Sequence, residues 1–418
     1  MSPTLALVSQ RAAVQAETST MSDRYNLLSS ELTANPYPTY ARMRRDHPVC
    51  QVEPGGMWAV SRYDDVMAVL KDPKLFSSRG FGAATNPPWL GGNPFSESMV
   101  ALDPPEHGRL RALIARAFGA AAMSQLEPRV RAFAEQAVAG LPLGQPVDLH
   151  PLYALRIPTA VIGNLLGVDP ALYSRLEGWA DLITRGVTTV RPEEHERKQM
   201  ARDAVAELKR YFSEMLELRR FEPGEDLVSE LLQASAGGEA LTHDELISFC
   251  TLLLVGGIET VVNLLGASLT VLLENPALWA RLRADRSLIP AFIEEVLRYE
   301  PPIQAAPRST TEDVELRGVR LPRGAPVLVL MGSACHDEAR FPDPDRFDMD
   351  RPGSQSLPFG HGIHFCLGAQ LARMEGRLAL EALLDRCGGL ERGPTPVTWF
   401  RSLVVRGPAS LPLVLRPV

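Results

Sequence analysis

Hydrophobic residues recur at helical spacing through residues 107–275, which predicts a mainly helical region. Clusters of glycine and proline interrupt this pattern and mark the expected helix ends, at residues 140–146, 167–170, 186–192 and 237–238. Thr242 and, three residues later, Glu245 form a capping-box pattern that begins the last helix, and Asn275-Pro276 ends it. At 1.5 Å per residue this helix is about 50 Å long, enough to cross a whole domain.

The apolar run inside this last helix, residues 247–273, is long enough to cross a bilayer, and Glu259 is its only charged residue. However, Glu259 and Asn263 lie in its middle, Gly256-Gly257 interrupts its centre, and no aromatic belt or basic flank surrounds it. A helix that is apolar all round is also what the interior of a large soluble protein requires. We therefore interpret the run as a buried core helix.

Shorter elements are predicted on either side of the helical region. Before it we expect a helix over residues 37–46, a hairpin over 49–60 that turns at Gly55-Gly56, and a helix over 63–70. After it we expect a helix over 289–299 that stops at Pro301-Pro302, then short strands at 314–316, 319–321 and 327–330. Residues 336–366 are expected to be irregular, followed by a last helix over 367–386 and β character near 404–405 and 413–415.

These elements together predict a mainly α fold with a small β subdomain. The β-rich lobe would comprise residues 34–77, residues 303–335 and the C-terminal strands. The larger helical lobe would comprise residues 103–300 and 336–390. Both belong to a single domain, residues 26–418, and residues 1–25 are expected to form a flexible tail.

Residues 77–103 are rich in glycine and proline, so no regular element is expected there. Loops of this length inside compact domains are usually lids or binding loops. The stretch also carries three aromatic residues, Phe81, Trp89 and Phe95, that a linker exposed to solvent would not need. We expect a loop that faces a ligand.

Composition narrows the functional classes. The 418 residues carry a net charge of −7, which argues against a general nucleic-acid-binding protein. The apolar run at residues 5–8 is too short for a signal peptide. The chain has five cysteines, which are scattered and lack metal-site spacing: Cys50, Cys250, Cys335, Cys366 and Cys387. We therefore expect no disulfides, and we expect a cytoplasmic location.

The strongest local signal is the sequence FGHGIHFCLGAQLAR, residues 359–373. Gly360 and Gly362 allow a tight turn that brings backbone close to a partner. Cys366 lies near the start of the predicted last helix, where free N–H groups favour a thiolate, and Gly368 leaves space for a flat group. This arrangement suits a thiolate that binds a metal.

Three other interpretations of Cys366 stay open from the residues alone. It could be an ordinary buried cysteine, as we assume for Cys250 and Cys387. It could join His361 and His364 in a zinc cluster, although a fourth ligand is not evident. It could also be a nucleophile, whose base the sequence cannot identify.

A second signal, Gly256-Gly257-Ile258-Glu259-Thr260, lies in the middle of the apolar helix. Each glycine costs about 1 kcal/mol relative to alanine in a helix, and burying a carboxylate is also unfavourable. Such costs usually have a functional reason, although a packing kink with a satisfied glutamate explains this segment equally well.

The two segments together resemble the cytochrome P450 family, the haem-thiolate monooxygenases, in its soluble bacterial form. Residues 359–373 are similar to the cysteine-ligand loop of that family over its full length. Residues 256–260 are similar to its oxygen-activating helix motif. The resemblance implies the P450 fold, with haem between a long central helix and the cysteine-ligand loop.

Three further motifs occur in the order and spacing of the same family. Glu295 and Arg298 match its ExxR pair, and Arg346 lies in a segment like the one that completes a buried Glu–Arg–Arg cluster. His107 and Arg111 resemble its HxxxR haem-propionate site. The similarity runs from about residue 30 to the C-terminus.

The resemblance implies a role for each site residue. Cys366 would be the iron ligand of heme b, with Phe359 shielding the sulfur, and Thr260 and Glu259 would deliver protons to bound O2. Glu295, Arg298 and Arg346 would have a structural role. The remaining expected haem contacts are His107, Arg111, Arg308 and His364 at the propionates, and Gly256, Gly360 and Gly368 along the ring.

No flavin or iron–sulfur signature is present, so electrons from NAD(P)H would arrive through a separate ferredoxin or flavodoxin and its reductase. A basic docking face is expected, with Arg109, Arg116, Arg373 and Arg377 as candidates. We expect a monomer that binds neither nucleic acid nor membrane.

The substrate pocket is expected to be mostly apolar, since it would draw on residues 81–99, 184–190, 303–306 and 403–405. Thr251 and Gln304 are among its few expected polar groups. The other individual candidates are Phe81, Trp89, Leu252, Val255, Ala305, Val404 and Val405. A neutral terpenoid, polyketide or steroid-like molecule from secondary metabolism is expected to be hydroxylated or epoxidised, with a fatty acid as the second choice.

Two alternatives to this function remain. A haem protein that senses gas and performs no chemistry would bind the same cofactor, although it would not need the Glu259–Thr260 pair. An enzyme of the same fold could instead catalyse oxidative coupling or desaturation, which the sequence does not distinguish from hydroxylation.

Overall fold

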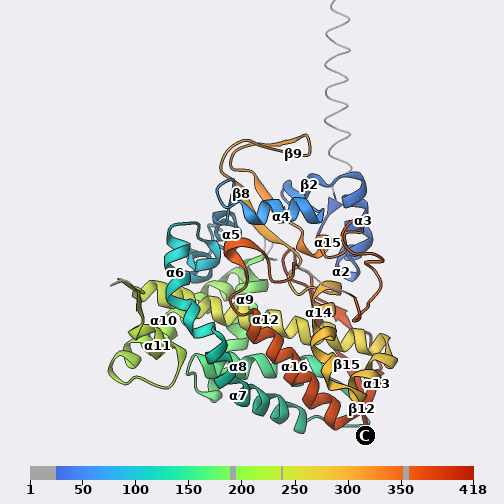
Figure 1. The fold of residues 1–418 in the computed structure, drawn as a ribbon. Helices are drawn as coiled ribbons and strands as arrows, with labels where there is room; N and C mark the ends of the chain where they lie inside the picture. Colours follow the sequence, from blue (N-terminus) through green and yellow to red (C-terminus); the bar gives the residue numbers. More distant parts are fainter. Residues whose placement is uncertain (1–24, 189–193, 237–238, 352–356) are drawn as a thin grey trace, which may run out of the picture.

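The structure is a computed structural model that describes residues 25–188, 194–236, 239–351 and 357–418. The predicted flexible tail therefore lies outside the described residues, apart from Tyr25, which begins strand β1. Most of the chain is helical, and the strands gather in small sheets (Figure 1). The expectation of a mainly α fold with a small β part is confirmed.

The largest sheet has six strands in the order β1-β2-β3-β11-β8-β4. Strands β2 and β3 form the predicted hairpin, and β11 pairs parallel to β3 and antiparallel to β8. Its strands are β1 (Tyr25–Asn26), β2 (Val49–Glu53), β3 (Met57–Val60), β4 (Phe76–Ser77), β8 (Ala306–Thr310) and β11 (Pro326–Val329). Strand β8 was not predicted.

The smaller sheets follow in part the β runs read from the sequence. The predicted strands at 314–316 and 319–321 form the hairpin β9 (Val314–Leu316) and β10 (Val319–Leu321). The run near 413–415 is the centre of β15 (Pro412–Pro417), which pairs with β12 (Cys387–Arg392) and β5 (Pro146–Asp148). The run at 404–405 makes only an isolated bridge, between Ile303 and Val405. The remaining pairs are β13 (Thr398–Trp399) with β14 (Pro408–Ser410) and β6 (Ser235–Ala236) with β7 (Glu239–Ala240).

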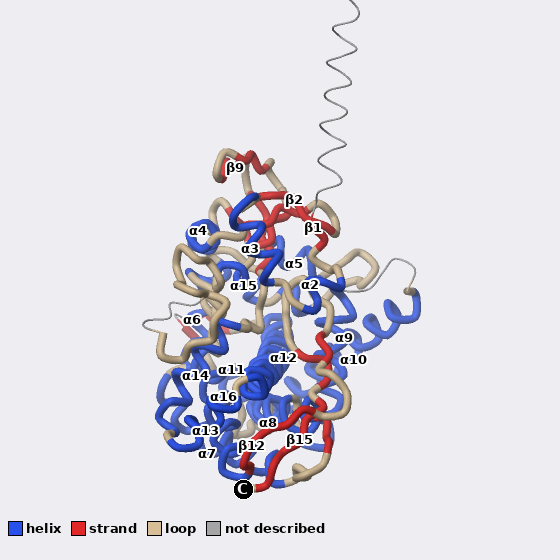
Figure 2. The backbone as a smooth tube through the Cα atoms, turned by 90° about the vertical axis from the view of Figure 1, so that its right-hand side faces the viewer, coloured by secondary structure: helices blue, strands red, loops and turns tan. Residues whose placement is uncertain are grey.

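The helices form the bulk of the molecule and surround one long helix, α12, which is seen nearly end-on in Figure 2. Their bounds are α2 (Ser30–Ala34), α3 (Tyr37–Asp46), α4 (Tyr63–Lys71), α5 (Arg79–Thr85), α6 (Glu106–Ile114), α7 (Ala120–Ala139), α8 (Arg156–Leu165), α9 (Tyr173–Thr188), α10 (His195–Phe221), α11 (Leu227–Gln233), α12 (His243–Glu274), α13 (Pro276–Ala284), α14 (Ile289–Tyr299), α15 (Met331–Ala334) and α16 (Ala369–Arg386).

Helix α12 is 32 residues long and begins at the predicted capping box, in which Thr242 and Glu245 satisfy each other's backbone N–H groups. Among the described residues it is the helix that is long and apolar enough to cross a membrane, yet 72% of its most apolar window is buried inside the protein. The interpretation as a buried core helix is confirmed. Gly257 permits close packing with α8, because a Cβ there would lie 2.4 Å from Ile162 Cδ1.

The expectation of an irregular stretch at residues 77–103 is only partly correct. Helix α5 occupies residues 79–85, and two short 3-10 turns follow, Pro94–Glu97 and Met99–Ala101. Gly80 does not break α5. It allows the helix to approach β8, since a Cβ on Gly80 would lie 2.4 Å from the carbonyl carbon of Arg308. Phe81 and Phe95 pack edge to face, with 5.4 Å between ring centroids.

Candidate active site

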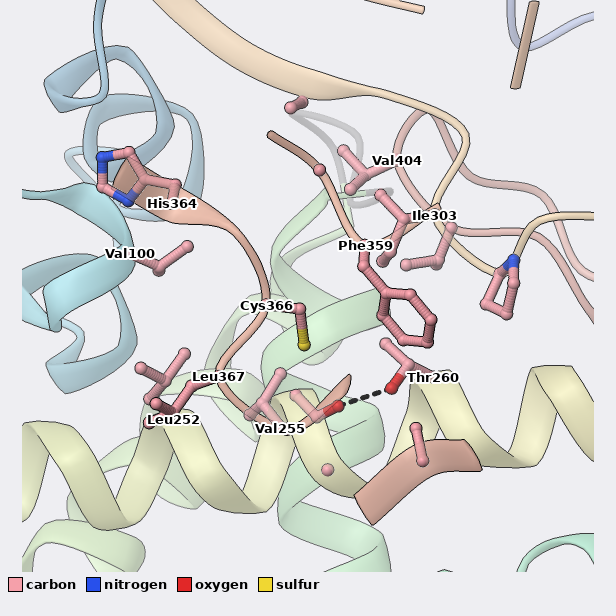
Figure 3. A pocket seen from close by; sticks show the side chains of 18 of the residues that line it. Val100, Leu252, Val255, Thr260, Ile303, Phe359, His364, Cys366, Leu367 and Val404 are labelled. Atoms are coloured by element: carbon pink, nitrogen blue, oxygen red, sulfur yellow. Dashed lines mark hydrogen bonds between the residues drawn. The ribbon is translucent and has the colours of Figure 1, made fainter. Parts of the chain in front are cut away.

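A cavity of about 370 Å³ separates the middle of α12 from the segment that carries Cys366. Helix α5, the start of β8 and residues 402–405 are among the segments that contribute to its other walls. Figure 3 shows Cys366 on one side of the cavity and Val255 and Thr260, both on α12, on the other. The structure thus brings the two strongest sequence signals to opposite walls of one space.

The sulfur of Cys366 opens into this cavity. Its backbone N–H donates to Phe359 O at 2.9 Å, which closes the turn built on Gly360 and Gly362, both with positive φ. Burial raises the pKa of the Cys366 thiol, while the Gly368 N–H, Arg111 and Arg373 act in the opposite direction. A cation bound at the sulfur would supply the charge that is lacking and keep the thiolate.

The other readings of Cys366 are weaker in the structure. Within the described part of the chain, no three His, Cys, Asp or Glu side chains cluster as metal ligands, which argues against the zinc site with His361 and His364. His364 Nε2 instead lies 2.8 Å from Ser78 Oγ. A nucleophile would need a base near the sulfur, but the groups that favour its thiolate are an amide and two arginines.

Phe359 lines the cavity beside Cys366, as expected (Figure 3). The Arg373 guanidinium lies 4.4 Å from the centroid of the Phe359 ring. Arg373 also forms a two-point ion pair with Glu294, at 2.5 and 3.1 Å. These contacts hold the Phe359 ring in place beside the Cys366 sulfur.

Four basic side chains, His107, Arg111, Arg308 and His364, line the same cavity. The His107 and His364 rings are 4.3 Å apart, and His107, only 2% exposed, has no hydrogen-bond partner for its Nε2. Arg308 is 7% exposed, and burial lowers its pKa to about 10. Burial, then Arg308, His107 and Arg111, lower the pKa of His364 to about 3. Such a cluster is electrostatically incomplete without an anion.

Two glycines leave a slot between the walls. A Cβ on Gly256 in α12, or on Gly368 at the N-terminus of α16, would meet no atom within 4 Å, and both residues line the cavity. A flat group can therefore lie between α12 and the Cys366 segment. With a thiol on one face and a cluster of donors for carboxylates, the residues present fit haem.

Thr260 and Glu259 differ in their access to the cavity. Thr260 lines it, and its Oγ1 donates to Gly256 O at 2.6 Å (Figure 3). Such a bond from a threonine to the carbonyl one turn earlier can bend a helix. Glu259 is 7% exposed and does not belong to the cavity wall.

The ion-pair cluster contains a different arginine from the one predicted. Glu295 and Arg298 form a buried two-point pair, at 2.8 and 2.9 Å, as expected. The third member is Arg351, whose Nε lies 3.4 Å from Glu295 Oε1 and whose side chain is 9% exposed. Arg346 contributes only its carbonyl oxygen to Arg298, while its side chain, 67% exposed, pairs with Asp348. The prediction for Arg346 is therefore wrong, because the turn after Asp343 directs that side chain outward.

Six of the individually predicted pocket residues line the cavity: Phe81, Leu252, Val255, Ala305, Val404 and Val405. Three others do not. Trp89 lies against α10, with Lys198 Nζ 5.8 Å from its ring; Gln304 donates to Pro301 O; and Thr251 donates to Ile247 O. Thr184 lines the cavity, whereas the side chains of residues 185–190 lie outside the described ones.

Sequence reasoning missed Glu375, which lines the cavity from α16 and is 1% exposed. Its carboxyl oxygens have no hydrogen-bond partner, and burial raises its pKa well above 4.5, which favours the neutral form of the group. The signal that could have identified Glu375 is an acidic residue on an otherwise apolar face of the predicted last helix. Among the polar residues of the wall, Thr85 and Ser402 were also not singled out.

Comparisons with known proteins agree with this geometry. Residues 180–392 match the model of the family described as Cytochrome P450. The chain is 39% identical to the monooxygenase PikC of Streptomyces venezuelae, over 92% of this chain and 92% of that protein. It is 37% identical to a vitamin D(3) 25-hydroxylase of Pseudonocardia autotrophica, over 96% of this chain and 99% of that protein. Among solved structures, cytochrome P450 CYP109Q5 from Chondromyces apiculatus superposes with a TM-score of 0.86 at 41% identity, over 94% of this chain and 99% of that one. The chain belongs to the cytochrome P450 family and is a monooxygenase, an enzyme class that uses haem iron and O2.

Proposed function

We propose that this monooxygenase inserts one oxygen atom of O2 into a neutral, apolar small molecule of terpenoid, polyketide or steroid type, by hydroxylation or epoxidation. The observation that carries the proposal is the part of the cavity lining away from the basic cluster and the Cys366 segment, where the described side chains other than Glu375 are aliphatic, aromatic, thioether or hydroxyl-bearing. Apart from the Cys366 segment, the ionisable groups of the cavity lining are the basic cluster, which the cofactor would occupy, and Glu375, whose neutral form is favoured because burial raises its pKa. None remains to pair with a charged substrate.

Several relatives are named for, or were solved with, molecules of this kind. One is named mycinamicin IV hydroxylase/epoxidase and another vitamin D(3) 25-hydroxylase. A P450 of Bacillus megaterium, 34% identical, was solved in complex with testosterone. These names support a bulky, polycyclic or macrocyclic substrate for this chain.

The cofactor would be heme b, which supplies the reductive activation of O2. Cys366 would hold its iron, the slot at Gly256 and Gly368 would hold its ring, and His107, Arg111, Arg308 and His364 would hold its carboxylates. Gly360 would shape the turn that brings Cys366 to the iron. Thr260 Oγ1 can turn from Gly256 O to hold a proton toward the cavity, and Glu259 would pass protons to it.

Electrons from NAD(P)H would come through a ferredoxin or flavodoxin and its reductase. Of the four arginines expected on the docking face, Arg109 pairs with Glu245, Arg373 with Glu294, and Arg377 with Glu127 and Glu381. Arg116 is exposed and is the strongest remaining candidate for contact with an acidic carrier. We further propose a cytoplasmic monomer that binds neither nucleic acid nor membrane.

The test begins with the reduced, carbon-monoxide-treated holoenzyme, which should show the red-shifted band of a thiolate ligand, and Cys366→Ser should lose it. A compound library is then screened for the low- to high-spin shift of the Soret band, and hits are incubated with NADPH and surrogate redox partners. An oxygenated product from a neutral polycycle or macrolide supports the proposal. Preference for fatty acids would refute the substrate class. Coupled or desaturated products would refute oxygen insertion, and failure to consume any compound would favour a gas sensor.

A further inference from the structure

We propose that Arg406, together with Glu300, is a positioning residue that sets the shape of the substrate cavity. The inference rests on the proposed function only in taking the space between α12 and residues 302–305 as the place where the substrate lies. Neither Arg406 nor Glu300 lines the cavity, so both would act through the chain segments that they hold.

Two segments, residues 302–305 and 402–405, form one wall of the cavity, and they are joined to each other. Val404 O accepts from Gln304 N at 2.7 Å and from Ala305 N at 3.3 Å, and Ile303 bridges to Val405. Figure 3 shows the side chains of Ile303 and Val404 next to each other on this wall. The shape of the wall therefore depends on what holds this pair of segments in place.

Arg406 fastens the joined segments to the N-terminal helices. Its backbone N–H donates to Pro302 O at 2.8 Å, and its guanidinium donates to Thr33 O at 2.8 Å and to Ala34 O at 3.0 Å, at the end of α2. The guanidinium also lies 4.1 Å from the ring centroid of Trp399. Arg406 is 7% exposed, so these bonds are shielded from water.

Glu300 holds the same place from the other segment, and we call the Arg406–Glu300 pair the anchor. Glu300 follows α14 directly, two residues before the first wall segment, and its Oε1 accepts from Arg406 Nε and from Tyr37 Oη, the latter at 2.8 Å. The planar guanidinium thus reaches a carboxylate and two carbonyls with fixed directions, which a lysine cannot reproduce. The two wall segments and helices α2 and α3 meet at this one buried pair.

The anchor is separate from the groups that would hold the iron and the protons. Cys366 precedes α16 and Thr260 lies in α12, and among the described residues the hydrogen bonds of Arg406 and Glu300 go to other partners. Loss of the anchor should therefore change how a bulky ligand fits while leaving access of a small ligand to the iron unchanged. This separation supplies the experiment.

Two nitrogen ligands of haem iron serve as probes in the ferric holoenzyme: imidazole, which needs little space, and clotrimazole, whose three aromatic rings must contact the wall. Arg406→Gln should weaken clotrimazole about tenfold or more, because wall contacts are lost, and change imidazole less than about twofold. Glu300→Gln should give a smaller change of the same kind, since Arg406 keeps its two carbonyl bonds. Dissociation constants come from titration of the Soret shift.

Arg219→Gln is the matched control, since Arg219, although more exposed than Arg406, also pairs with a buried carboxylate, Asp226 at 2.7 Å, and donates to a carbonyl, Gly167 O, away from the wall. It should leave the ratio of the two dissociation constants unchanged. The proposal is overturned if Arg406→Gln moves that ratio no more than Arg219→Gln does. If Arg406→Gln yields no holoenzyme, the ratios for Arg406→Lys and Glu300→Gln decide in the same way. A wrong substrate class would instead appear as neutral polycycles that fail to shift the spin state of the unmodified enzyme, with the azole ratios unaffected.

Discussion

Replacing Arg351 with methionine should destabilise the holoenzyme several times more than the same replacement at Arg346. The two residues lie in the same segment, and the sequence motif favours Arg346. In the structure Arg351 is nine-tenths buried beside Glu295, whereas Arg346 projects toward solvent. The pair of variants therefore tests which arginine completes the buried cluster.

The expected magnitude follows from the contacts that each side chain makes. Arg351 lies near Glu295 and donates to three backbone carbonyls, those of Pro342, Asp343 and Arg346. Glu295 would keep both bonds from Arg298, so its charge is not left alone and the full cost of about 3–5 kcal/mol for a broken buried pair does not apply. At roughly 1 kcal/mol per lost carbonyl bond, less some relief by water at the exposed edge, Arg351→Met should cost about 2–3 kcal/mol. The exposed pair between Arg346 and Asp348 contributes about 0–1 kcal/mol.

The assay is the midpoint of thermal loss of the Soret band, measured at one scan rate for all variants because unfolding of a haem protein need not be reversible. An unfolding entropy of about 2.1 cal/mol/K per residue converts 2–3 kcal/mol into a decrease of about 3 °C for a chain of this size. Arg346→Met should decrease the midpoint by about 1 °C or less. An equal or larger decrease for Arg346→Met would refute the assignment of Arg351 to the cluster.

Three further predictions concern the cavity. Thr260→Ala should release several times more peroxide per NADPH consumed while O2 uptake continues, and unchanged coupling would contradict the role of its hydroxyl. Gly256→Val should lower the haem-to-protein ratio of the purified enzyme, because the valine methyl groups would fill the slot. Gly178→Ala, on the exposed face of α9, is the control and should leave that ratio unchanged. Burial raises the pKa of Glu375, so the folded protein holds a proton that the unfolded chain releases above about pH 4.5, and stability should fall as pH rises from there. Glu375→Gln removes this loss and should raise the thermal midpoint more at pH 8 than at pH 5.5; an equal change at both pH values would contradict the buried, neutral acid.

The sequence predicted those features that depend on local chemistry. The capping box at Thr242 begins α12 because its two bonds involve residues three apart, and the proline after Asn275 ends it for an equally local reason. Cys366, Thr260 and the Glu295–Arg298 pair could be identified because each lies in a short motif at fixed spacing. Motifs of this kind can be recognised whatever the conformation of the surrounding loops.

Features that depend on the path of the backbone through space could not be predicted. Arg346 and Arg351 are both arginines of one irregular segment, and only the turn at residues 343–346 decides which side chain points inward. Gly80 resembled a helix breaker, but its lack of a side chain serves an approach to β8, more than 200 residues later in the chain. Trp89 was assigned to the cavity because it is an aromatic residue of a loop expected to face a ligand, but its partner is Lys198 on α10, more than 100 residues later in the chain.

The apolar character of α12 has a consequence for the synthesis of the protein. The helix is covered in part by α14 and α16, which leave the ribosome only after it. At about 5–20 residues per second, the third of the chain that follows α12 takes on the order of ten seconds to translate. During that interval the apolar faces of α12 that α14 and α16 later cover stay exposed, and aggregation competes with completion of the core. Slower growth at low temperature and extra chaperone capacity should therefore increase the yield of soluble enzyme.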